Sequence, residues 1–252
     1  AINPVPRRMI RRALRQAWDK ICPGEPLRLT VEIFVPRGEE LARHTLNPRL
    51  GIVGGISILG TTGLVKPFSH QAYRATIASS LRVAQAAGLR HIGFSTGGKS
   101  EEHLQALLPK LPEEAFVQMG DYVRFALKVA AHMKFSEITA AAFFGKALKI
   151  AQGFGHTHAS RGLADLPELG RWTLELTGNT SLAQAVTGAN TARQTLELIT
   201  EAGAGRVVAQ VGAAMLAALR EYAGSGPEVN AVMLDFDGLL LWRGESPGEA
   251  AP

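Results

Sequence analysis

The sequence has little cysteine, few aromatic residues and no long apolar run, and each shortage excludes something. Cys22 is the only cysteine in 252 residues, so no disulfide can form within the chain and no cysteine-rich metal site can be built. Aromatic residues are only 6% of the chain, which argues against stacking of single-stranded nucleic acid. Residues 50–65 form the longest uncharged apolar stretch, too short and too rich in glycine to span a membrane. We therefore expect a cytoplasmic protein with no membrane span, no bound metal and no nucleic-acid partner.

What is present describes a folded protein with a surplus of positive charge. Apolar residues make up 46% of the chain and charged residues 19%, which is enough for a packed core. Lys and Arg outnumber Asp and Glu by 27 to 22, so the formal net charge is +5. A positive balance favours an anionic partner without naming its class. The net charge is compatible with a phosphate-bearing ligand and with a polycarboxylate ligand.

The order of apolar patterns predicts an α/β fold. Residues 7–20 have the periodicity of a helix with an arginine-rich face, and residues 27–35 alternate like a strand. Helical patterns then alternate with short strand-like runs at residues 91–95, 116–119, 138–143 and 229–236. Asp121, after the second of these runs, is the expected cap of a helix over residues 121–133. Such alternation indicates a parallel sheet covered on both faces. We expect a Rossmann-like parallel or mixed sheet with flanking helices over residues 66–243, after the remainder of an N-terminal α+β unit (1–65) and before a loose tail (244–252).

Residues 93–100 match the spacing G-x-x-x-x-G-K-S of a phosphate-binding loop, between a predicted strand and a predicted helix. A nucleotide hydrolase would also need a carboxylate to hold Mg²⁺, and Asp235 near the end of the last predicted strand could supply it. The alternative is a simple glycine turn after a strand. The match is short, so a phosphate-loop nucleotide enzyme is kept as a competing hypothesis.

Two further patterns favour ordinary structure over chemistry. Asp235 and Asp237 resemble the nucleophile motif of aspartyl-phosphate phosphatases, but only 15 residues follow, so a turn that closes the domain is the better interpretation. His156, His158 and Asp165 could ligate a metal. Because both histidines fall in a predicted loop, we expect hydrogen bonds to a ligand in a polar cleft instead.

The most unusual segment of the sequence runs from Thr45 to Pro67. Five glycines and several hydroxyl residues stand among apolar ones, which predicts a backbone that approaches a ligand closely and offers N–H and O–H donors. A nucleoside-bearing cofactor or a carboxylate-rich ligand would suit it, and a packed glycine turn is the alternative. The residues expected to contact a ligand are Gly54, Gly55, Ser57, Gly60, Thr61 and Thr62.

At these residues the sequence resembles the cobalt-precorrin-5B C1-methyltransferases of anaerobic cobalamin biosynthesis. The matching segments are residues 2–7, 35–42 and 45–67, with weaker matches at 120–123, 145–146, 148–149, 157–158 and 165. The resemblance is clear over about residues 1–165. The resemblance implies a further domain with a Thr-Thr-Gly motif before residue 1, and a Gly-Arg turn where Gly97 to Ser100 stand here.

The resemblance implies S-adenosylmethionine as the methyl donor, cobalt-precorrin-5B as the acceptor and cobalt-precorrin-6A as the product. Besides the glycine segment, Asp121 is expected to meet a ribose hydroxyl of the donor at the carboxyl end of a strand. Because methyl transfer depends on alignment and exclusion of water, no nucleophilic residue is required and none is assigned. The residues expected to bind the acidic macrocycle are Asn3, Arg7, Arg49, His156 and His158.

The same resemblance bears on partners. A homodimer is one expectation, and a separate chain that carries the preceding domain is another. If that domain is required for catalysis, this chain would be an incomplete, corrinoid-binding fragment of the enzyme, which is the alternative to an active methyltransferase.

Overall fold

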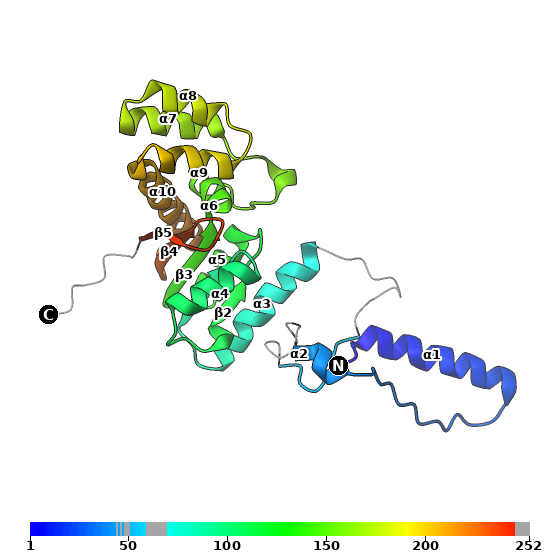
Figure 1. The fold of residues 1–252 in the computed structure, drawn as a ribbon. Coiled ribbons are helices and arrows are strands. Elements are labelled where there is room, and N and C mark those ends of the chain that lie inside the picture. The colour runs from blue at the N-terminus through cyan, green and yellow to red at the C-terminus, as the bar shows by residue number, and fades with distance from the viewer. Residues whose placement is uncertain (44, 46, 48–50, 59–69, 245–252) are drawn as a thin grey trace. The chain divides into compact units, whose positions relative to one another are not determined.

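The computed structural model describes residues 1–43, 45, 47, 51–58 and 70–244 (Figure 1). The chain divides into two compact units, Ala1–Tyr73 and Arg74–Pro252. The second unit holds a five-stranded mixed sheet with flanking helices, which confirms the expected α/β class. Within the described residues, no helix is both long and apolar enough to cross a membrane.

The first unit contains two helices, α1 (Pro4–Ile21) and α2 (Gly38–Arg43). Proline suits the first turn of α1 because its fixed backbone angle is already helical and its missing N–H has no partner to lose there. Ile2 and Ile58 form a parallel bridge. Of the described residues in this unit, only Pro6 and Ala42 are buried, so the described part of the unit has almost no core.

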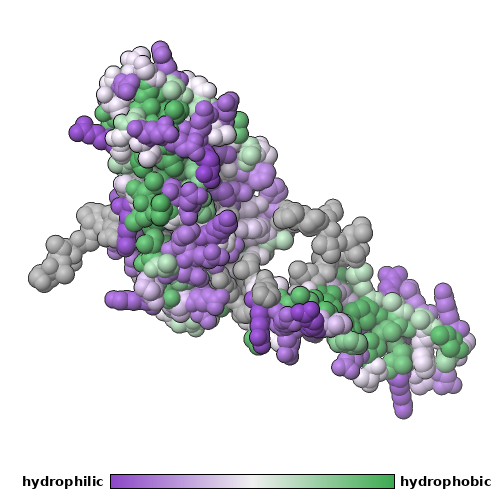
Figure 2. Space-filling view, viewed as in Figure 1, coloured by the Kyte–Doolittle hydropathy of each residue, from purple (hydrophilic) through white to green (hydrophobic). Residues whose placement is uncertain are grey.

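The strand predicted over residues 27–35 is wrong. No described residue pairs with this segment, and its backbone is irregular up to α2. An alternating pattern marks an apolar face, but a strand also needs a neighbour to share its hydrogen bonds. Leu29, Val31 and Ile33 consequently stay 52%, 48% and 43% exposed. Figure 2 shows hydrophobic residues on the surface of this unit.

The sheet of the second unit has the strand order β2-β1-β3-β4-β5. The first four strands are parallel, and β5 pairs antiparallel with β4. The predicted strands correspond to β1 through β4, whereas β5 was not predicted. The bounds are β1 (His91–Ser95), β2 (Phe116–Gln118), β3 (Glu137–Phe143), β4 (Glu228–Leu234) and β5 (Leu240–Gly244).

Helices cover both faces of this sheet (Figure 1). Leu104 of α4 packs on one face in a cluster with Phe116, Ala141 and Val232. On the other face, α10 packs against β4 and β5 and beside α5 and α6. These helices and the one before β1 are α3 (His70–Ala86), α4 (Gly98–Leu107), α5 (Val123–His132), α6 (Phe144–Ala151) and α10 (Gly205–Ala223).

Three short helices lie between α6 and α10 in the sequence: α7 (Leu166–Thr177), α8 (Thr180–Thr187) and α9 (Ala192–Glu201). Each begins at a polar cap residue whose side chain accepts a backbone N–H three residues later. The caps are Asp165, Asn179 and Thr191. Such caps satisfy otherwise unpaired N–H groups and set where each helix starts. The α7 and α8 helices pack closely because Gly170 has no side chain, and a Cβ there would lie 2.0 Å from Thr187 Oγ1.

The strand order places a topological switch between β1 and β3. From β1 the chain moves to β2 on one side, and it then returns to β3 on the other side of β1. The loops that follow β1 and β3 therefore leave the carboxyl edge of the sheet in opposite directions. Open α/β sheets bind ligands in the crevice that such a switch opens.

Candidate functional site

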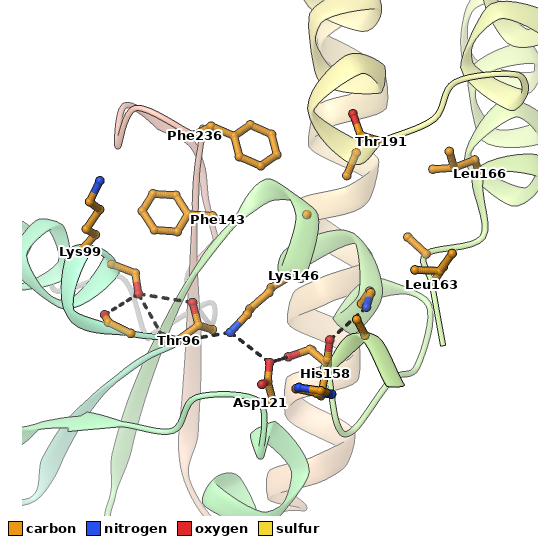
Figure 3. Close-up of a pocket in the computed structure, with 18 of the residues that line it drawn as sticks. Thr96, Lys99, Asp121, Phe143, Lys146, His158, Leu163, Leu166, Thr191 and Phe236 are labelled. Carbon is orange, nitrogen blue, oxygen red and sulfur yellow. Dashed lines mark hydrogen bonds and ion pairs between the residues drawn. The ribbon is translucent and has the colours of Figure 1, made fainter. Parts of the chain in front are cut away.

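A pocket of about 890 Å³ opens at this switch point (Figure 3). The turns after β1 and β3 form one side, and residues leading into α7 and α9 form the other. Its volume falls in the range of small-molecule sites, about 300–1,000 Å³. The lining residues are Thr96, Gly97, Gly98, Lys99, Ser100, Asp121, Phe143, Gly145, Lys146, Lys149, Thr157, His158, Ala159, Leu163, Ala164, Leu166, Asn190, Thr191, Ala192 and Phe236.

A hydrogen-bonded network around Asp121 crosses the floor of the pocket. Lys146 Nζ lies 3.0 Å from Asp121 Oδ1, and the Thr157 hydroxyl donates to the same oxygen at 2.8 Å. Lys146 also donates to the carbonyl oxygen of Thr96 at 3.3 Å, which joins the turns after β1 and β3. Both bonds to the carboxylate use Oδ1, so Oδ2 has no bond to any described residue.

Asp121 was expected at the carboxyl end of a strand and also as the cap of the next helix. The first expectation is confirmed, because Asp121 follows β2 and lines the pocket. The second is wrong. The α5 helix begins at Val123 with Tyr122 at its cap position, since the Asp121 side chain is held by Thr157 and Lys146 instead.

The network keeps Asp121 ionised. Burial by itself would raise the pKa of this carboxyl group, but the hydrogen bond from Thr157 and the charge and hydrogen bond of Lys146 outweigh it, and the pKa lies below its ordinary value. Lys149 behaves differently: burial lowers its pKa more than the charge of Asp121 raises it. Its ammonium donates to the carbonyl oxygens of Thr157 at 3.0 Å and Gly162 at 2.8 Å.

The lowered pKa of Asp121 predicts a loss of stability in acid. The ionised carboxylate stabilises the fold fully above its pKa in the unfolded chain, about 3.9, and this contribution is lost as the pH falls through the lower pKa of the folded protein. Urea unfolding of the wild type and of Asp121→Asn checks this. At pH 7 the unfolding free energy of the wild type should exceed that of Asp121→Asn, and the difference should shrink toward zero in strong acid. A difference that does not depend on pH would contradict the prediction.

The two predicted histidines separate at the pocket. His158 lines it, and its Nδ1 lies 2.8 Å from the Ser160 hydroxyl. His156 does not line it and packs edge-on against the Tyr122 ring, with the centroids 4.6 Å apart. Among the described residues, no three His, Cys, Asp or Glu side chains are grouped so that they could hold a metal ion.

The described part of the glycine segment belongs to a second cavity, of about 550 Å³, within the first unit. Gly54 and Gly55 line it together with Phe34 and Val35. Gly54 has a φ of +82°, a backbone conformation that favours glycine.

The hydroxyl of Ser57 is used inside this segment, because it donates to Asn47 Oδ1 at 3.2 Å. Four of the expected contact residues, Arg49, Gly60, Thr61 and Thr62, lie outside the described residues.

The remaining expected substrate contacts lie at the start of α1. The N–H of Asn3 donates to the carbonyl oxygen of Ile58 at 3.1 Å, and its own carbonyl accepts the N–H of Arg7. Both residues are exposed. Asn3 occupies the cap position without a hydrogen bond from its side chain to the helix.

The phosphate-loop hypothesis does not fit the backbone of residues 93–100. Gly93 lies inside β1, where a Cβ would be 2.8 Å from the Phe116 ring, and only Thr96 and Gly97 separate β1 from α4. Two residues are too few for a loop that wraps a phosphate. The Ser100 hydroxyl closes the turn, since it donates to the Gly97 carbonyl at 2.9 Å and accepts the Thr96 N–H at 3.1 Å. The segment is the glycine turn of the alternative hypothesis.

The Asp235 motif is likewise a turn, as expected. Asp235 Oδ1 accepts the N–H groups of Asp237 and Leu239, both at 2.8 Å, and so shapes the connection from β4 to β5. The carboxylate of Asp235 therefore stabilises the turn through these hydrogen bonds.

Sequence reasoning missed the lysines of the pocket. Lys146 and Lys149 stand three residues apart on α6, a helix that was not predicted because its apolar residues continue the run of β3. Positions three apart lie on one face of a helix. A pair of lysines at this spacing directly after a strand was the available signal.

Family models and individual relatives point to the same protein family. The CbiD family model matches residues 1–67, and a model described as CbiD, C-terminal domain, matches residues 156–245. A relative from Nitratidesulfovibrio vulgaris is 50% identical over 79% of this chain and 51% of its own, and one from Rubrobacter xylanophilus is 43% identical over 98% and 63%. Both are named cobalt-precorrin-5B C(1)-methyltransferase. The search of solved structures gave no match.

The chain spans between about half and two thirds of the length of the relatives described, including a Geobacillus kaustophilus protein of the same name that is 46% identical over 81% of this chain and 54% of its own. The two family models match the N-terminal and C-terminal parts of the present chain, and the alignments with the relatives cover most of the sequence between those parts. This chain belongs to the CbiD family.

Proposed function

We propose that this chain takes part in the methylation of C1 of cobalt-precorrin-5B, with S-adenosylmethionine as the donor and cobalt-precorrin-6A as the product. The names of the relatives support the reaction class and the acceptor. The observation that carries the proposal is the switch-point pocket, where an ionised carboxylate with one uncommitted oxygen stands after β2.

In this proposal Asp121 binds the ribose of the donor. A ribose presents two neighbouring hydroxyl groups, and a carboxylate is a strong acceptor for such donors. Oδ1 is held by Lys146 and Thr157, so the carboxylate is fixed in orientation while Oδ2 accepts a ribose hydroxyl. An acidic residue at the carboxyl end of a strand beside a switch point has the same role in dinucleotide-binding sheets.

The apolar side of the pocket suits the nucleobase. Phe143 and Phe236 lie beside each other in Figure 3, across from Leu163 and Leu166. Planar bases pack well against aromatic and aliphatic side chains, and those side chains also exclude water. This wall and the Asp121 network together provide one apolar and one polar surface for an adenosine.

The reaction itself is a direct displacement. The ring carbon forms a bond to the methyl carbon while the bond from that carbon to the sulfonium sulfur breaks, and the electron pair stays on sulfur as a neutral thioether. Alignment of the two reactants in a dry pocket can supply much of the acceleration. The protein groups in this scheme bind and orient, and none of them forms a covalent bond.

The other predicted contacts are part of the same proposal. Backbone amides of Gly54 and Gly55 and the segment that follows would contact a reactant in the first unit. Arg7 and Arg49 would pair with macrocycle carboxylates, as guanidinium groups do well. His158 would donate or accept a hydrogen bond at the pocket. A homodimer and a separate chain with an upstream domain stay predictions.

Calorimetric titration with S-adenosylhomocysteine, the product form of the donor, tests the proposal. We expect one binding site per chain, and only weak binding of ATP because the turn after β1 does not wrap a phosphate. The full-length Nitratidesulfovibrio vulgaris relative serves as the reference protein. Binding of ATP without binding of S-adenosylhomocysteine would overturn the donor assignment, and so would binding of neither by both proteins.

A further inference from the structure

The charges of the switch-point pocket do not balance. Three lysines line it, Lys99, Lys146 and Lys149, against the single carboxylate of Asp121. A cleft with a surplus of one charge concentrates ligands of the opposite charge. The donor S-adenosylmethionine carries a positive sulfonium, so the surplus does not serve the donor's reacting centre.

The three lysines differ in what they already contact. Lys146 is bound to Asp121 and to the Thr96 carbonyl, and Lys149 to two backbone carbonyls. Within the part of the chain that the structure describes, the side chain of Lys99 makes neither an ion pair nor a hydrogen bond, and the residue is exposed at the edge of the pocket. The ammonium of Lys99 is therefore available to a ligand.

The surroundings of Lys99 indicate which chemical class that ligand has. Figure 3 shows Lys99 on the same side of the pocket as Phe143 and Phe236. Those rings are assigned to the nucleobase of the donor, so a cation at the edge beyond them suits the anionic arm of a second, larger ligand. The backbone turn next to Lys99 is closed by Ser100, so the binding group is the side chain and not a phosphate cradle.

We propose that Lys99 binds a peripheral carboxylate of the tetrapyrrole acceptor at the edge of the switch-point pocket, and so selects an acceptor with free acid side chains. The inference rests on the proposed function. It adds a residue that the sequence analysis did not place in the site. Under it, donor and acceptor meet in one pocket: the donor is held by Asp121 on the floor, and the acceptor enters past Lys99.

Two corrinoid probes test this inference. Dicyanocobyrinic acid carries free acid side chains, and cyanocobalamin carries amides in their place. Affinities are measured by absorbance titration with the wild type, Lys99→Ala, Lys99→Arg and a control, Lys110→Ala. Lys110 is exposed just beyond the other end of α4 and does not line the pocket, so its removal changes the net charge equally.

We expect Lys99→Ala to weaken binding of the acid probe about tenfold, as the loss of one charge-assisted hydrogen bond would. Lys99→Arg should keep most of the affinity, Lys110→Ala should match the wild type, and cyanocobalamin should bind weakly to all four proteins. High salt should reduce the difference between Lys99→Ala and the wild type.

Separate outcomes reveal which proposal fails. Equal acid-probe affinity in Lys99→Ala and the wild type, equal losses in Lys99→Ala and Lys110→Ala, or no binding of the acid probe by the wild type would each overturn the inference. Binding of S-adenosylhomocysteine should be unchanged in Lys99→Ala, which also shows that the variant is folded. If the wild type binds the acid probe through Lys99 but does not bind S-adenosylhomocysteine, the donor assignment fails and the Lys99 site stands.

Discussion

Replacement of Asp121 by alanine is expected to weaken binding of S-adenosylhomocysteine about 100-fold. The change removes the oxygen proposed to accept a ribose hydroxyl, and hydrogen bonds to charged groups contribute about 1.5–3 kcal/mol each. It also leaves the Lys146 ammonium without its carboxylate, at a position where the Thr96 carbonyl is the one remaining acceptor among the described residues. Calorimetry gives the affinity, and a thermal melt reports whether the variant is folded.

A series of variants separates the ligand contact from the network. Thr157→Val removes only the bond to Oδ1 and should cost less affinity than Asp121→Ala. Asp121→Asn keeps one acceptor oxygen without the charge and should lie between them. Glu114→Ala removes an exposed carboxylate before the opposite end of β2 and should have no effect. If Asp121→Ala binds as tightly as the Glu114→Ala control, the ribose assignment is wrong.

Substitution of Gly212 by alanine is expected to lower the free energy of unfolding by about 1–2 kcal/mol. Gly212 lies in the middle of α10, and a Cβ there would be 2.2 Å from Trp242 Cδ2 and 2.6 Å from Trp242 Cγ. These atoms are close to the base of the side chain, so the clash moves β5 itself and not a flexible tip. Overpacking of this kind costs about 1–3 kcal/mol, more than the gain of about 1 kcal/mol that alanine brings to a helix.

The same helix supplies the control. Gly205 begins α10, and a Cβ there would meet nothing within 4 Å, so Gly205→Ala should be neutral or slightly stabilising. Adding Trp242→Leu to Gly212→Ala should recover part of the loss, because the smaller side chain makes room. Urea unfolding at equilibrium measures all four proteins. Equal stability of Gly212→Ala and Gly205→Ala would contradict the packing described for β5.

The parallel core of the fold could be predicted because its signals are local. A buried strand reads as a short apolar run, and the pattern at residues 91–95 coincides with β1. The pattern at residues 27–35 was as regular and failed, since pairing depends on a neighbour that a period of two does not reveal. β5 was missed for the opposite reason. Its side chains do not alternate clearly, and it exists as a strand because β4 and Trp242 hold it in place.

The site could be predicted only in part, because local patterns are visible in the sequence and contacts between distant residues are not. Asp121 could be placed because the end of a strand is visible in the sequence. Its partners Lys146 and Thr157 stand 25 and 36 residues further along the chain, and no local pattern connects them to it. The sequence indicated Lys99 only as part of the spacing of a phosphate-binding loop. The residue types fit that motif, but the backbone of these residues forms a strand, a short turn and a helix instead of a loop.

The two sides of the pocket belong to parts of the fold that we expect to differ in how well they tolerate substitutions. Asp121, Lys146 and Thr96 are tied to strand ends, so replacing them disturbs the sheet edge. Leu163 and Leu166 precede or begin α7, in a helical excursion whose helices carry their own caps. The lining of the pocket at Leu163 and Leu166 can therefore be redesigned without disturbing the sheet edge, which makes this excursion the part of the pocket wall best suited to engineering.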